Sequence, residues 1–204
     1  MKITKLVHSC LLVEGNDKTA LIDPGAFSWQ SVLVDLAKIA RLDYLIITHN
    51  HPDHLHEPFV QAVKQRFPDV RLAANAEISQ QLQNMGMLAA DDACIGFEAA
   101  HEPVPSGGEV PINWGWHFDR LTHPGDSFGF TETREVLALP YVAPWGSTTA
   151  AVELAKRLKP KYVVPVHDWH LSDEARKRYA GLLVAALQPA GINVISTENG
   201  TIEI

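Results

Sequence analysis

Residues 44–54 have the sequence YLIITHNHPDH, and they decide how the rest of the chain is interpreted. The first four residues are apolar and predict a short buried strand, and the polar segment directly after it contains His49, His51, Asp53 and His54. Imidazole and carboxylate groups are good ligands for zinc and similar divalent metals. α/β sheets commonly place such sites just beyond the end of a strand. His49 and His51 can converge on one ion while Asp53 and His54 face a second, so this segment predicts a metal site.

The remaining sequence predicts a mixture of strands and helices. Apolar alternation and short apolar runs predict strands at 3–7, 11–14, 19–22, 44–47, 70–73, 114–118, 120–122, 136–139, 162–166, 192–195 and 201–203. Apolar spacing and N-capping residues predict helices at 31–39, 58–66, 148–158, from Asn75 to before Gly86, and from Ser172 to Leu187. Between the last two strands, Asn199-Gly200 is typical of a type I′ hairpin. Because hairpins come first and helices alternate with strands later, we expect packed sheets covered by helices.

The composition limits the class of protein. The 204 residues are 46% hydrophobic, which predicts a single domain, 1–204, with a substantial core. The net charge is −7 and no run of Lys or Arg occurs, so nucleic-acid binding is not favoured. Two cysteines without CxxC spacing argue against a disulfide framework and favour a reducing, cytoplasmic compartment. No apolar run has the length of a membrane span, and the oligomeric state is not indicated.

Three further motifs occur in order along the chain: LIDPG at 21–25, THPGDS at 122–127 and VVPVHD at 163–168. Together with HxHxDH at 49–54, they resemble the signature of the metallo-β-lactamase superfamily over most of the chain. Within that superfamily, the chain is most similar to the small, single-domain branch that includes ascorbate-6-phosphate lactonase-like proteins. The resemblance implies an α/β (α+β) fold, a four-layer αββα sandwich with the site at one edge, and a metal-dependent hydrolase.

The resemblance also implies a ligand set for two ions. It assigns the first ion to His49, His51 and a third histidine. It assigns the second ion to Asp53, His54 and His167. Asp126 would be the bridging ligand between the two ions.

The third histidine of the first ion has three candidates. His101 is the expected one, because it stands just before a loop at about the place of the family's ligand. His117 lies inside a predicted strand, and His123 stands three residues before Asp126, so either can instead have a structural or supporting role.

The implied chemistry is hydrolysis. Two ions that share a water lower its pKa, which gives a metal-bridged hydroxide at neutral pH, and they also polarise the substrate. We expect this hydroxide to attack a small-molecule ester, lactone, amide or phosphodiester. Asp53 is the expected catalytic residue, because it is placed to orient the nucleophile or take its proton. Asp126 makes the bridge all-oxygen where certain β-lactamases have a cysteine, which argues against antibiotic hydrolysis.

Several alternatives stay open at this point. Zinc is the expected metal, and manganese or iron also fits His and Asp ligands. An iron-dependent oxidoreductase on the same fold, or a non-catalytic metal-stabilised binding protein, would therefore use the same residues. Asp23 either supports a ligand histidine or simply ends a strand, and His8 either reaches the pocket or is structural. Three more residues follow strand ends and either shape the pocket or pack elsewhere: Tyr141, Trp145 and His170.

Overall fold

The computed structural model describes residues 1–31, 35–105, 107–195 and 200–204, within which the chain forms two six-stranded sheets. The first sheet has the order β12-β1-β2-β3-β4-β5, with the strands Thr201–Glu203, Lys2–Lys5, Leu11–Gly15, Lys18–Ile22, Tyr44–Ile46 and Arg71–Ala73. The second sheet has the order β11-β10-β9-β8-β7-β6, with the strands Asn193–Val194, Tyr162–Val166, Val136–Pro140, Leu121–His123, Trp114–Phe118 and Cys94–Glu98.

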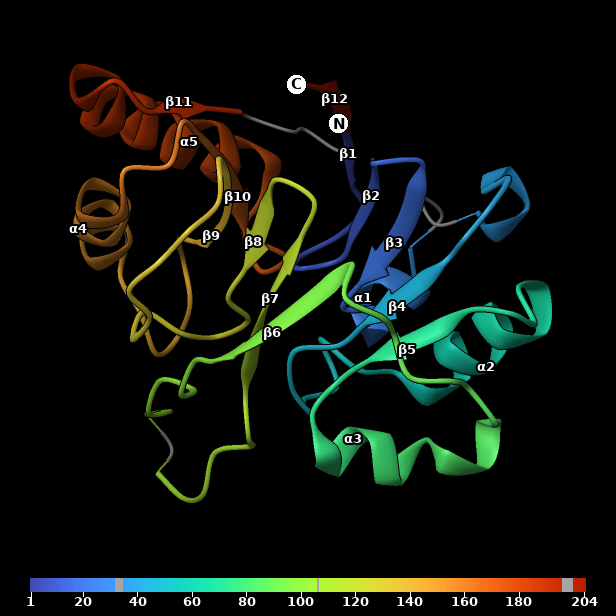
Figure 1. The fold of residues 1–204 in the computed structure, drawn as a ribbon. Coiled ribbons are helices and arrows are strands. Elements are labelled where there is room, and N and C mark those ends of the chain that lie inside the picture. The colour runs from blue at the N-terminus through green and yellow to red at the C-terminus, as the bar shows by residue number, and fades with distance from the viewer. Residues whose placement is uncertain (32–34, 106, 196–199) are drawn as a thin grey trace.

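Helices cover the outer face of each sheet. The α-helices are α1 (Ala26–Trp29), α2 (Glu57–Arg66), α3 (Ala76–Gln81), α4 (Thr148–Leu158) and α5 (Asp173–Leu187), and short 3-10 turns lie at Leu36–Lys38, Gln83–Met85 and Gln188–Ala190. Figure 1 shows α2 and α3 on the side of the first sheet and α4 and α5 on the side of the second. The result is the expected four-layer αββα sandwich. Among the helices described, none has the length and apolar character needed to cross a membrane.

The core explains why the strands are apolar on both sides. In β4, Tyr44 and Ile46 face the second sheet, whereas Leu45 faces the opposite way, toward α2. Side chains of a strand alternate between faces, so a strand covered on both sides must be apolar throughout. The run at 44–47 therefore forms the predicted buried strand, and it delivers the polar segment that follows to the edge of the sheet.

The two sheets are connected in the same way. In β1 to β5 and again in β6 to β10, the first three strands pair antiparallel and the later pairs are parallel. As a consequence, β1, β3, β4 and β5 end at one edge of their sheet, and β6, β8, β9 and β10 end at one edge of theirs. The motifs found in the sequence occupy the loops at these carboxyl ends.

Two of the predicted helix starts are confirmed by their caps. Asn75 Oδ1 accepts the Ile78 N–H at 3.0 Å at the start of α3. Ser172 Oγ accepts the Ala175 N–H at 3.2 Å at the start of α5, which ends at Leu187 as predicted. Such caps satisfy backbone donors that have no partner within the helix.

The predicted helix at 31–39 is wrong. Asp35 is extended, its carboxylate accepts the Ala37 N–H, and only a 3-10 turn follows at Leu36–Lys38; positions 32–34 lie outside the described residues. The α-helix of this region is α1, which begins earlier, where the Ala26 N–H donates to Pro52 O at 2.7 Å. A tertiary contact with the histidine-rich loop thus decides the helix, which local apolar spacing could not reveal.

The predicted hairpin between 192–195 and 201–203 is also wrong. β11 pairs parallel with β10 in the second sheet, whereas β12 pairs antiparallel with β1 in the first. The Asn-Gly signal is local, and here pairing with distant strands outweighs it. The sequence also failed to predict β6, whose Gly96 weakens the strand pattern. A Cβ at Gly96 would lie 2.7 Å from the Trp114 ring, so the glycine is needed for packing between β6 and β7.

Candidate metal centre

The loop after β4 crosses the carboxyl edge between the two sheets. The His54 N–H donates to His51 O at 2.9 Å, which closes a turn around Pro52 and Asp53. Gly25 packs directly against this turn, and a Cβ there would lie 1.7 Å from Asp53 O. The glycine after β3 is therefore required by the close approach of the two loops.

Four side chains form a first group of candidate metal ligands: His49, His51, His101 and Asp126. One ligand atom from each lies within 4.8 Å of the others. His49 Nε2 and His51 Nδ1 are 3.2 Å apart, and His101 Nε2 is 3.6 Å from Asp126 Oδ2. The structure thus brings His101 beside the HxH pair.

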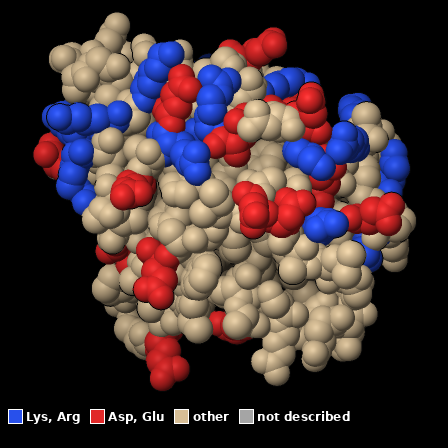
Figure 2. All heavy atoms as spheres, viewed as in Figure 1, with Lys and Arg blue, Asp and Glu red and all other residues tan. Residues whose placement is uncertain are grey.

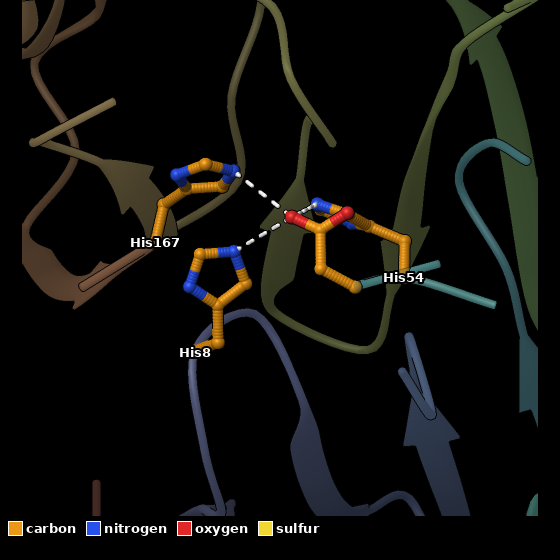
Figure 3. Close-up of side chains that lie close together, drawn as sticks. His8, His54 and His167 are labelled. Carbon is orange, nitrogen blue, oxygen red and sulfur yellow. Dashed lines mark hydrogen bonds and ion pairs between the residues drawn. The ribbon is translucent and has the colours of Figure 1, made fainter. Parts of the chain in front are cut away.

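Four other side chains form a second group: His8, Asp53, His54 and His167. Figure 3 shows the three histidine rings around one carboxylate oxygen. That oxygen is Asp53 Oδ2, which lies 3.1 Å from His8 Nε2, 3.7 Å from His54 Nε2 and 3.8 Å from His167 Nε2. Its side chain is 25% exposed, whereas the three histidines are buried.

Asp126 lies between the two groups. Its Oδ1 is 3.2 Å from His54 Nε2, and its Oδ2 is 3.1 Å from His167 Nε2 and 3.9 Å from His49 Nε2. The Trp145 indole N–H also donates to Oδ2 at 2.9 Å. One carboxylate therefore contacts histidines of both groups, which is the placement that a bridging ligand requires.

Hydrogen bonds fix which nitrogen of each ring faces the centre. His101 Nδ1 donates to Glu102 O at 2.6 Å, and His167 Nδ1 donates to Val142 O at 3.3 Å, because a carbonyl can only accept. His54 Nδ1 donates to the Asp23 carboxylate at 2.7 Å. His49 Nδ1 donates to the Thr48 hydroxyl, whose own proton goes to Asp23. In all four rings, Nε2 is left to face the centre, as in metal-binding histidines held by a partner on the other nitrogen.

The donor atoms fit a metal ion. Among the described residues, His54 Nε2, His101 Nε2 and Asp126 Oδ1 are buried without a hydrogen-bond partner. His54 Nε2 and Asp126 Oδ1 are close in space but are not aligned for a hydrogen bond. Buried polar atoms are nearly always satisfied, so unpartnered ones that point at a common centre indicate a missing partner. Imidazole nitrogens with carboxylate oxygens suit zinc, manganese or iron.

Burial and neighbouring charges shift the pKa values of the candidate ligands in different directions. Burial, and after it the nearby His54, lower the pKa of His49 well below its usual value. Burial would also lower the pKa of His54, but the carboxylates of Asp126, Asp53 and Asp23 outweigh it and hold that pKa well above the usual value. Burial would raise the pKa of Asp53, but His54 and the hydrogen bond from His8 hold it far below. Both groups thus keep ionised carboxylates close to imidazole rings.

The alternatives for the third histidine lie elsewhere. His117 stacks on Phe97 and hydrogen-bonds Thr122 Oγ1 at 2.9 Å. His123 donates from Nε2 to Ser9 O at 3.1 Å and accepts the Gly125 N–H at Nδ1. Neither ring belongs to the two groups of candidate ligands.

The residues whose roles were open now have definite contacts. Asp23 is fully buried and holds Thr48 and His54, so its carboxylate supports a candidate ligand. Trp145 contacts Asp126, and Tyr141 OH lies 3.4 Å from the Asp168 carboxylate, away from both groups. His170, which is exposed, belongs to neither group.

Sequence reasoning missed one buried pair next to the centre. Lys5 Nζ donates to Asp168 Oδ2 at 2.6 Å, and both side chains are buried. Burial lowers the pKa of Lys5, and Asp168 opposes that shift. A signal was present in the sequence. Lys5 lies two residues after the core residue Ile3 in β1, so both side chains point to the same, inward face of the strand.

A family model described as β-lactamase superfamily domain matches residues 2–167. The chain belongs to the metallo-β-lactamase superfamily. The resemblance seen in the sequence is thereby confirmed at the level of the superfamily, while the lactonase-like branch stays a prediction.

Two relatives match this superfamily member over most of their length. Protein Rv0786c of Mycobacterium tuberculosis is 30% identical over 198 residues, which cover 90% of this chain and 91% of the relative. A metal-dependent hydrolase of Archaeoglobus fulgidus is 26% identical over 197 residues, covering 82% and 83% of the two chains.

Two solved structures share the fold. Igni18, a metallo hydrolase from Ignicoccus hospitalis, superimposes with a TM-score of 0.71 at 20% identity and covers 100% of this chain and 98% of its own. CmlA, a diiron β-hydroxylase from Streptomyces venezuelae, superimposes with a TM-score of 0.68 at 15% identity and covers 100% of this chain but 54% of its own. At such identities the likeness shows the fold alone.

Proposed function

We propose that the chain is a binuclear metal-dependent hydrolase, acting as a single domain, 1–204, on a small-molecule ester, lactone, amide or phosphodiester. The observation that carries the proposal is the meeting of two groups of buried ligand atoms at Asp126. Membership of the superfamily and a relative named metal-dependent hydrolase support it. The proposed ligands are the predicted ones: His49, His51 and His101 of the first group, Asp53, His54 and His167 of the second, and Asp126, which contacts histidines of both.

Two divalent ions, zinc by expectation with manganese or iron as alternatives, would lower the pKa of a shared water and polarise the substrate carbonyl or phosphoryl group. The chain's own residues prepare the site for this chemistry. Asp126 holds the two groups together from one carboxylate. Asp23 and the backbone carbonyls of Glu102 and Val142 fix the histidine rings from the other side.

Asp53 is the proposed catalytic residue. Its carboxylate is ionised, because the neighbouring rings hold its pKa far below the usual range, and it is the more exposed of the two carboxylates in the centre. An ionised carboxylate open to solvent can accept a hydrogen bond from the attacking water and take its proton. Asp126, which is buried, is not accessible in this way.

The test begins with elemental analysis of protein purified without added metal, followed by ester, lactone, phosphodiester and thioester substrates. We expect two ions per chain, loss of hydrolysis on chelation and its return on adding zinc or manganese. His51→Ala should lose an ion and activity, whereas His56→Ala, from the same loop but outside both groups, should keep them. Metal-free protein with undiminished hydrolysis would contradict the proposal.

A second candidate function is iron-dependent oxidation, because the fold is shared with a diiron β-hydroxylase and the ligand types bind iron. Iron in the purified protein together with substrate-dependent oxygen consumption would favour it. Hydrolysis by the zinc form without oxygen consumption would exclude it.

A further inference from the structure

No Lys or Arg stands in the stretches of loop that directly follow the strand ends at the candidate centre. Eight segments directly follow the strands that end at this edge: 6–10, 23–35, 47–56, 74–75, 99–113, 124–133, 141–147 and 167–172. Two of these connections continue toward the opposite edge with Lys38, Arg41 and Arg134. The chain has 17 Lys and Arg residues, and none stands in the eight segments themselves. The same segments contribute several acidic side chains outside the centre, among them Asp35, Glu102, Glu109 and Glu132. On the face that Figure 2 shows, Lys and Arg gather in the upper part, above the region where Figure 1 places α3 and the loop after β6.

Of the cations beside these segments, Arg157 donates from its guanidinium to Phe128 O at 3.0 Å, and two others are ion-paired. Lys5 is buried against Asp168 at 2.6 Å. The Arg176 guanidinium donates to Asp173 Oδ1 at 2.7 Å and to the carbonyl oxygens of Asp168 and Trp169. Neither offers a free positive charge to a phosphate or carboxylate group, which Lys and Arg usually bind.

Apolar side chains occupy the same segments instead. Large hydrophobic residues that are exposed among the described residues include four from these loops: Trp29, Val110, Ile112 and Trp169. Exposed apolar side chains in the loops beside a polar centre are typical of a ligand-binding surface.

An aromatic wall leads outward from the second group. His8 contacts Asp53 and packs edge-on against Phe27 at a centroid distance of 5.4 Å. Phe27 in turn stacks on Trp169 at 3.9 Å with the planes 2° apart. These three aromatic rings help to line a cavity of about 370 Å³, open to solvent, which Arg176 borders with its paired guanidinium.

We propose that the substrate is an uncharged ester, lactone or amide with an apolar group that contacts this wall, and that substrates with an anionic group away from the scissile bond are disfavoured. The inference rests on the proposed hydrolase function and narrows its substrate class. Apolar contact supplies the binding energy, and the surplus of acidic side chains repels anions.

A matched pair of esters tests whether a negative charge on the substrate lowers the rate of hydrolysis. p-Nitrophenyl hexanoate and mono-p-nitrophenyl adipate share the leaving group and chain length, but the adipate ends in a carboxylate. With the zinc-loaded protein, kcat/KM should be about tenfold or more lower for the adipate, and the gap should shrink at high salt as repulsion is screened. An adipate hydrolysed as well as the hexanoate, or a gap that widens with salt, would overturn the substrate class.

The apolar wall is tested by chain length and by Trp169. From p-nitrophenyl acetate to hexanoate, kcat/KM should rise by about two- to fourfold per methylene. Trp169→Ala should flatten that rise, whereas Leu182→Ala, an exposed apolar residue on α5, should leave it unchanged. An unchanged rise in Trp169→Ala would overturn the role of the wall. If a protein holding two ions hydrolyses none of the esters, amides or phosphodiesters offered, the hydrolase function itself fails.

A second inference concerns His8 and rests on different observations. His8 follows β1 by three residues, just as His101 follows β6 by three residues at the equivalent place in the second sheet. The backbone of His8 has a positive φ of 60°, which is unusual for a residue with a side chain, and its carbonyl accepts the His167 N–H at 3.3 Å. His8 is thus held beside the second group by its backbone as well as its ring.

The hydrogen bonds of His8 are reversed relative to the other four rings. The Trp169 backbone N–H, which can only donate, lies 3.3 Å from His8 Nδ1. An accepting Nδ1 carries no proton, so the proton of this ring stands on Nε2, 3.1 Å from Asp53 Oδ2. A protonated Nε2 has no lone pair for a metal ion.

We infer that His8 is a positioning residue that donates from Nε2 to Asp53, and that it is not a metal ligand although its ring belongs to the second group. The N–H holds the exposed carboxylate in one orientation while its other lone pairs stay available.

Two amide variants separate these roles. The Gln side chain reaches about as far as Nε2 and can donate to Asp53, but its amide nitrogen cannot bind a metal. Asn tolerates positive φ, yet its shorter amide does not reach Asp53. We expect His8→Gln to keep two ions and nearly full kcat, and His8→Asn to lower kcat and to weaken the second ion roughly tenfold in chelator competition, with KM little changed.

Loss of one ion in both variants would show that His8 is a ligand and would overturn the inference. Equal and undiminished kcat and metal affinity in both would show that the hydrogen bond has no role, which overturns it as well. Circular dichroism of each variant checks that the fold is retained.

Discussion

The two halves of the molecule have the same strand connections but contribute to the centre in different ways. The first half, β1 to β5, presents His49, His51, Asp53 and His54 from one loop after one strand. The second half, β6 to β10, presents its three candidate ligands from three separate loops: His101, Asp126 and His167. Each group contains residues from both halves. An ion bound to either group would therefore link the two sheets at this edge. Substitutions in either half therefore test how strictly the two halves depend on each other.

The largest effect is expected for Asp126→Ala. This residue of the second half contacts both groups, so its loss should remove both ions and lower kcat/KM by roughly a thousandfold or more. Elemental analysis and ester hydrolysis measure the two effects. Asp69→Ala, an exposed carboxylate distant in sequence from both groups, is the control. Retention of two tightly bound ions in Asp126→Ala would show that the halves bind metal independently.

A smaller effect is expected for His101→Ala, because this ring belongs to one group only. One ion should be lost while the second group keeps its own, and kcat/KM should fall by about a hundredfold. His117→Ala is the matched control, since His117 also lies in the second half but contacts Phe97 and Thr122. The assignment of His101 is wrong if the control loses the ion and His101→Ala keeps it.

Asp23→Asn should weaken the hydrogen bonds that hold Thr48 and His54 in the first half. An amide offers one acceptor oxygen where the carboxylate holds both Thr48 and His54. We expect metal affinity to fall roughly 10- to 100-fold at the second group with the first group less affected. Competition with a chelator measures it, and Asp35→Asn, whose carboxylate caps a surface turn, is the control. Equal weakening of both ions would mean that Thr48 transmits the change to His49.

The smallest effect is expected for Trp145→Phe, which keeps a ring but removes the donor to Asp126 Oδ2. The net contribution of one such hydrogen bond is about 0.5–1.5 kcal/mol, so kcat/KM should fall about two- to tenfold with both ions retained. Loss of an ion would show that Trp145 is needed to orient Asp126 for the pair of groups.

The same difference between the halves explains what the sequence could predict. The ligands of the first half are neighbours in the chain, so their spacing alone indicates a metal site at His49 to His54. His101 could not be separated from His117 and His123 by spacing, because its position depends on how β6 ends beside the first sheet. The place of His8 depends on a backbone with positive φ and on Trp169, which lies more than 150 residues away in the chain.

The fold shows the same division. Helices with an N-cap, such as α3 and α5, follow from local chemistry and were predicted. The hairpin signal at Asn199-Gly200 and the apolar spacing at 31–39 were overridden by contacts with distant segments. Local patterns therefore located the elements, while long-range pairing decided which sheet they joined.

The pairing of β12 with β1 has a consequence for folding. Thr4 Oγ1 lies 2.9 Å from Thr201 Oγ1, and the Ile204 N–H donates to Met1 O at 2.9 Å. The strand that covers β1 on this side thus follows it by almost 200 residues in the chain. Until the two strands pair, β1 is an open edge on a half-built sandwich, and such edges pair readily with other chains. The slow step of assembly, and the moment of greatest exposure to aggregation, should therefore be the pairing of β12 with β1, since contacts of long sequence separation form late.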